Sequence, residues 1–166
     1  MRGEDSGFRE AVSRQVSALS KLARSRTLFE NALTIDANPV PALHGLARRK
    51  IYMASGGAWM LPPEWRTAML DQAEVAIEQM LKQDPRNVAV HALRGSLLRA
   101  RGEIDHAIAA FELALSINPN DSFALAELGR TEIDAGRSRE AMSHLDVAIA
   151  LSPTDPHIYL RYFWAG

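Results

Sequence analysis

Apolar residues recur with a helical period along most of the chain, separated by short polar stretches. Between positions 104 and 115 they share one face at i, i+3, i+4 and i+7 spacing: Ile104, Ala107, Ile108, Phe111, Ala114 and Leu115. This spacing is typical of a helix that buries one side. The residues from Val88 to Ala100 have a similar period. The pattern therefore predicts amphipathic helices over 88–100 and 104–117.

Polar and turn-forming residues stand where these helices are expected to begin and end. Asn87 and Asp121 precede apolar-periodic segments, and their short side chains can accept hydrogen bonds from the free N–H groups of a helix start. Gly102 and Gly136 follow the first helix of each pair and permit a tight turn. Pro119 cannot continue the second helix. The unit is therefore a pair of antiparallel helices.

This unit recurs with a fixed period. The segments 83–87, 117–121 and 151–155 are alike, and their prolines are spaced by 34 residues. Several small residues keep the same spacing, including Gly95 with Gly129 and Ala107 with Ala141. A constant period of this length is the signature of a helical repeat protein.

The pattern resembles the tetratricopeptide repeat (TPR), whose 34-residue unit carries W-x₂-L-G-x₂-Y…A-x₃-F…P. The resemblance implies an all-α fold, in which antiparallel helix pairs stack as an α-solenoid with a right-handed superhelix and a continuous core. Three residues depart from the pattern: His91 and Arg94 stand at apolar positions, and Glu132 replaces an aromatic residue. The residues that carry the repeat signature are Gly95, Ala107, Phe111, Ala114, Pro119, Gly129, Ala141, Leu145, Ala148 and Pro153.

The register predicts a single TPR domain over 1–166. Its repeats cover about 6–39, 40–87, 88–121 and 122–155, with an incomplete final helix over 156–166. Whether residues 6–36 form one long helix or a helix pair stays open.

The repeat over 40–87 contains a 14-residue insertion around 52–65. Gly56-Gly57 is expected to end the first helix, and Pro62-Pro63 to precede a lengthened second one. Trp59 and Trp65 are expected to pack against their own helix pair, with a lid that contacts a ligand as the alternative.

Composition narrows the class of protein further. The chain has 166 residues, a net charge of −1 and no cysteine. Near-neutral charge does not favour nucleic acid as a partner, and the lack of cysteine excludes disulfide scaffolds and thiolate zinc sites. The sequence shows neither a signal peptide nor an apolar run of membrane-spanning length, so a cytoplasmic protein without membrane contact is expected.

No catalytic motif stands out in the sequence. It has no glycine-rich phosphate loop, no HExxH pair and no Gly-x-Ser-x-Gly elbow. We interpret the carboxylate pairs Asp71/Glu74 and Glu132/Asp134 as solvated faces of amphipathic helices. The chain is therefore expected not to be an enzyme and to need no cofactor or metal.

The resemblance implies that the first helix of each repeat lines a concave groove. Three arginines along such a groove, with aromatic residues between them, would suit a carboxylate-bearing peptide because arginine pairs bidentately. We therefore expect a non-catalytic protein–protein interaction or scaffolding module that binds a peptide or partner protein, an acidic one for preference. The groove candidates are His44, Arg48, Tyr52, Ser96, Arg99, Phe123, Arg130, His157 and Trp164.

Two alternatives stay open. The apolar C-terminal edge, residues 159–166, would also suit self-assembly into a homo-oligomer. The helix around Phe29, the tryptophan-containing insertion and the segment 151–155 resemble TPR modules found C-terminal in bacterial nucleotide cyclase and winged-helix regulatory proteins. That resemblance implies a regulatory segment of a larger bacterial protein, and no catalytic or DNA-binding residue is carried over.

Overall fold

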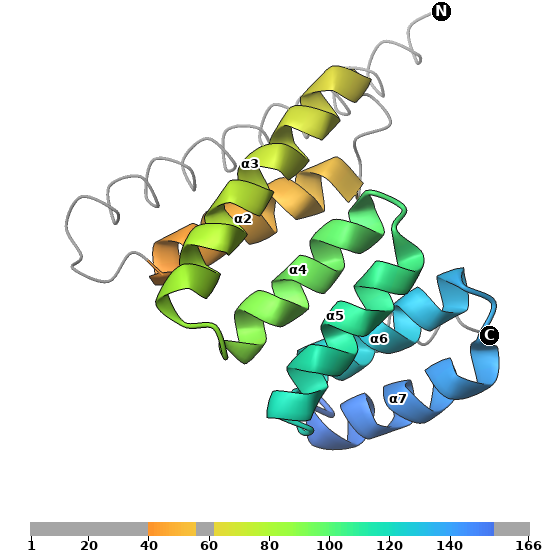
Figure 1. The fold of residues 1–166 in the computed structure, drawn as a ribbon. Coiled ribbons are helices and arrows are strands. Elements are labelled where there is room, and N and C mark those ends of the chain that lie inside the picture. The colour runs from red at the N-terminus through yellow and green to blue at the C-terminus, as the bar shows by residue number, and fades with distance from the viewer. Residues whose placement is uncertain (1–39, 56–61, 155–166) are drawn as a thin grey trace, which may run out of the picture. The chain divides into compact units, whose positions relative to one another are not determined.

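A computed structural model describes residues 40–55 and 62–154 of the chain, and all regular structure in these ranges is helical (Figure 1). The predictions for residues 6–39 and 156–166 lie outside the described residues. The helices are α2 (Val40–Ser55), α3 (Pro63–Gln83), α4 (Val88–Ala100), α5 (Ile104–Ile117), α6 (Ser122–Asp134) and α7 (Ser138–Leu151).

The chain divides into two compact units, residues 1–46 and 47–166. Of the first unit the structure describes only residues 40–46, the first turns of α2, in which Ala42 is buried. The second unit contains the rest of α2 and all of the helices from α3 to α7.

The ends of α4 and α6 are built in the same way. The Asn87 side chain accepts from the Val90 N–H at 3.2 Å, and the Asp121 side chain accepts from the Ala124 N–H at 2.8 Å. Gly102 and Gly136 turn the chain into the second helix with φ of 82° and 75°, which favours glycine. These features confirm the predicted capping residues and the predicted helices over 88–100 and 104–117.

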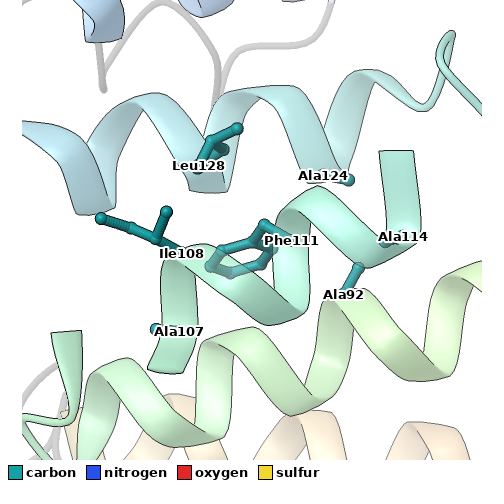
Figure 2. Close-up of a cluster of buried hydrophobic side chains, with 7 residues drawn as sticks. All are labelled: Ala92, Ala107, Ile108, Phe111, Ala114, Ala124 and Leu128. Carbon is teal, nitrogen blue, oxygen red and sulfur yellow. The ribbon is translucent and has the colours of Figure 1, made fainter. Parts of the chain in front are cut away.

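Each helix packs against the next along the chain from α3 to α7. Phe111 of α5 is fully buried between Ala92 of α4 and Ala124 and Leu128 of α6 (Figure 2). A core cluster thus joins one helix pair to the next, as the stacking of neighbouring repeats requires.

Glycines allow the two helices of a pair to cross closely. A Cβ atom at Gly95 would lie 2.7 Å from the ring carbons of Phe111. In the next pair, a Cβ atom at Gly129 would lie 2.8 Å from Cγ of Leu145 and 2.9 Å from the carbonyl oxygen of Ala141. A large residue on the second helix therefore fills the space that glycine leaves on the first.

The helix pair α2–α3 is longer than the others. In the repeat register, α2 ends three residues later than α4, and α3 begins seven residues earlier than α5. Pro63 occupies the start of α3, which confirms the lengthened second helix. Trp65 on this extension is 59% exposed, so the prediction that it packs against its own helix pair is wrong. Trp59 lies outside the described residues.

Candidate partner-binding surface

The structure places the predicted groove residues on the first helix of successive pairs. His44 belongs to the part of α2 that lies in the first unit. His157 and Trp164 lie outside the described residues. The others lie in the second unit: Arg48 and Tyr52 on α2, Ser96 and Arg99 on α4, and Phe123 and Arg130 on α6.

Three of these side chains reach the surface. Tyr52 is 72% exposed, and Arg48 and Arg130 are also exposed. The packing of the core does not account for them, so they are available for contact with a partner.

Ser96 is different, because it is buried within the packing of α4. Its hydroxyl donates to the carbonyl of Ala92 at 3.3 Å, one turn earlier on the same helix. Its polar group is therefore satisfied inside the helix, and the side chain does not face solvent in this structure.

Arg99 is held by acidic residues of the neighbouring pair. Its Nη2 donates to Oε2 of Glu127 at 3.2 Å, and its Nη1 lies 3.6 Å from Oδ2 of Asp134. The Arg99 side chain is 14% exposed and that of Glu127 only 5%. Such burial requires pairing, and here Glu127 supplies it. Sequence reasoning missed Glu127, although an acidic residue between Ala126 and Leu128 in a helix was a usable signal.

Arg48 has an aromatic neighbour instead. Its Cζ atom lies 5.7 Å from the ring centroid of Phe123, within the range of a cation–π contact. Phe123 is partly buried and packs against the core cluster around Phe111. The contact brings together residues from α2 and α6, which belong to non-consecutive helix pairs.

Ion pairs connect successive helix pairs through the turns. Arg101 Nη2, in the α4–α5 turn, donates to Asp71 and Glu74 of α3, each at 2.8 Å. Arg137 donates to Asp105 of α5 at 3.0 Å. The bond from Arg101 lowers the pKa of the Glu74 carboxyl below its ordinary value, and the bond to Glu74 raises the pKa of the Arg101 guanidinium. The pair Asp71/Glu74 therefore connects two repeats through Arg101. The interpretation of this pair as a solvated face did not include that contact.

Two departures from the repeat pattern have a structural explanation. Glu132, where an aromatic residue is usual, is buried and lies 2.8 Å from Nδ1 of His144 in α7. Its interpretation as part of a solvated face was wrong. Nε2 of the buried His91 lies 2.8 Å from the carbonyl oxygen of Pro85 and can donate to it. In both cases a polar contact replaces the usual apolar packing.

Over residues 40–55 and 62–154, no three acidic or histidine side chains gather closely enough to hold a metal ion. In the same part of the chain, no helix combines the length and the apolar character needed to cross a bilayer.

The repeated helix pairs, with small and large residues at matching positions, define a helical repeat protein. Residues 98–161 match the family model of the tetratricopeptide repeat. This segment and the fold are therefore similar to those of tetratricopeptide repeat proteins.

Known proteins of this fold are similar to the chain. Superkiller protein 3 of Schizosaccharomyces pombe is 28% identical over 144 residues, which cover 87% of this chain; the match spans only 10% of that protein. A thermophilic TPR protein of Thermus thermophilus superposes with a TM-score of 0.59 at 22% identity, over 93% of this chain and 95% of the other. MamA superposes with a TM-score of 0.56 at 19% identity, over 84% and 74%. The two structures share the fold of this chain.

Proposed function

We propose that the chain is a non-catalytic scaffolding module, which binds a peptide segment of a partner protein along the first helices of its repeats. The observation that carries the proposal is the set of exposed side chains on these helices. Arg48, Tyr52 and Arg130 come from α2 and α6 and project to the surface. The match of residues 98–161 to the TPR family model supports a protein-interaction role in general.

We expect the partner to be acidic because the exposed arginine side chains are positively charged. Arginine binds carboxylates through paired N–H donors, and Arg48 and Arg130 are the exposed candidates for this contact. Arg99 is a poor choice for testing the groove, because its removal would leave Glu127 buried without that donor.

The test is selection of random peptides displayed on phage against the full chain, followed by measurement of Kd for the enriched peptides by fluorescence anisotropy. We expect the double variant Arg48→Ala/Arg130→Ala to weaken binding by at least about tenfold, since hydrogen bonds to charged groups are lost. If peptides are enriched but bind the double variant with the same Kd as the wild type, the proposed site is contradicted.

A matched control removes the same charge elsewhere. Arg86 lies in the turn between α3 and α4, and Arg139 lies on α7; both are exposed and outside the predicted groove. The double variant Arg86→Ala/Arg139→Ala should change Kd by no more than about twofold. An equal loss in both double variants would mean that net charge, and not the groove, governs binding.

A further inference from the structure

The guanidinium groups of the three predicted groove arginines differ in the side chains that they contact. Arg99 pairs with Glu127 and Asp134. Arg130 also has an interaction partner. Within the part of the chain that the structure describes, the contact of Arg48 is the Phe123 ring, and no carboxylate pairs with it. An exposed guanidinium without a carboxylate is the group of this surface best suited to receive one from a partner.

The geometry of the contact supports this role. The Arg48 Cζ atom lies 5.7 Å from the ring centroid, and a cation–π contact engages the charge of the guanidinium without using its in-plane N–H donors in a hydrogen bond to an oxygen. Carboxylates accept from those in-plane donors in a bidentate manner. The cation–π contact and carboxylate binding are therefore compatible at Arg48.

Phe123 is also suited to hold the guanidinium in one place. Its ring packs against the core cluster that contains Phe111 and Leu128, so its position is fixed by the interior. A free arginine side chain loses much rotamer freedom when it binds, and a fixed ring reduces that loss.

We propose that Arg48 is the carboxylate-binding residue of the groove and that Phe123 is a positioning residue that acts through it. This inference rests on the proposed function and narrows the ligand to a peptide carboxylate. The carboxylate comes from an acidic side chain or from a C-terminus, because both present the same two oxygens.

The experiment uses the full chain and a peptide that the wild-type protein has enriched, with Kd measured for four variants. Arg48→Ala should weaken binding at least about tenfold, and Arg48→Lys less, since a charge remains but the bidentate donors are lost. Phe123→Leu keeps an apolar side chain in the core but removes the ring, and should weaken binding about two- to fivefold. Phe123→Tyr keeps the ring and should restore wild-type Kd.

The double variant Arg48→Ala/Phe123→Leu separates positioning from direct contact. If Phe123 acts through Arg48, the double variant binds as Arg48→Ala does. A further loss of affinity in the double variant would overturn the positioning role, because it would show that the ring itself touches the peptide. Loss of binding in Phe123→Tyr equal to that in Phe123→Leu would overturn it as well.

Changes to the peptide identify the source of the carboxylate. Replacement of its Glu and Asp by Gln and Asn removes side-chain carboxylates, and amidation removes the terminal one; one of the two should weaken binding as much as Arg48→Ala does. If neither does, the assignment of Arg48 is overturned. If Arg130→Ala abolishes binding while Arg48→Ala leaves it unchanged, the assignment fails but the proposed function stands. If no peptide is enriched at all, both fail.

Discussion

The interior of the helix pairs and the predicted groove differ in how regularly their contacts repeat from one pair to the next. In the interior, equivalent positions repeat: Gly95 faces Phe111 in one pair, and Gly129 faces Leu145 in the next. In the predicted groove, the residue type and the exposure at one repeat position differ between pairs. Arg48 and Arg130 are exposed, whereas the equivalent Ser96 is buried. The contacts of Gly95 and Gly129 are made within one pair, so they recur with it. The contacts of Arg48 and Arg99 reach other pairs and depend on the side chains present there.

The largest effect is expected in the interior. Phe111→Ala removes a fully buried ring and should lower the free energy of unfolding by about 3–5 kcal/mol. Leu113→Ala, on the same helix but at an exposed position, is the control and should cost less than about 1 kcal/mol. Chemical denaturation followed by far-UV circular dichroism measures both. Similar losses in the two variants would remove the distinction between interior and surface.

The close helix crossing at Gly129 gives the next largest effect. Gly129→Ala brings a Cβ atom against a backbone oxygen, which a side-chain movement cannot relieve, and should cost about 1–3 kcal/mol. Gly136→Asn is a control in the turn, where no atom lies near an added Cβ and Asn tolerates positive φ. Thermal unfolding should show a clearly lower Tm for Gly129→Ala than for Gly136→Asn; the reverse order would contradict close packing at Gly129.

The interior could be predicted from the sequence because its determinants are local. The period, the caps Asn87 and Asp121 and the turn residues Gly102 and Gly136 lie within one repeat, and they fix the helices that the structure shows. In the predicted groove, Arg99 and its partner Glu127 are 28 residues apart, and Arg48 and its partner Phe123 are 75 residues apart. Which of these side chains is paired and which is exposed follows from the stacking of the pairs, and the sequence pattern does not reveal it.

The ion pair of Arg99 tests whether the residues of the predicted groove also contribute to stability. Arg99→Ala leaves the buried Glu127 without that donor and should cost about 1–3 kcal/mol. Arg94→Ala, an exposed arginine on the same helix, should change stability by no more than about 0.5 kcal/mol. A double-mutant cycle with Glu127→Gln should show coupling between the two sites. Additive effects would mean that Arg99 does not depend on Glu127.

The smallest effect is expected at the ion pairs between repeats. The bond from Arg101 lowers the pKa of the Glu74 carboxyl below its ordinary value. The stabilisation from this ion pair is therefore complete at neutral pH and is lost as the pH falls through the lowered pKa. Because the Glu74 side chain is 43% exposed and screened, Glu74→Gln should cost at most about 1 kcal/mol at pH 7. Urea denaturation along an acid titration should show the wild type and the variant converging, and a difference that grows with acidity would contradict the sign.

The central claim is that the interior residues determine stability and the exposed residues determine peptide binding. It is tested most directly on the variant Arg48→Ala, by measuring stability and binding on the same preparation. We predict that Arg48→Ala changes the free energy of unfolding by less than about 1 kcal/mol, the size of an exposed cation–π contact. We predict at the same time that the Kd for an enriched acidic peptide rises at least about tenfold. A loss of stability comparable to that of Phe111→Ala, or an unchanged Kd, would contradict the role of Arg48 in recognition.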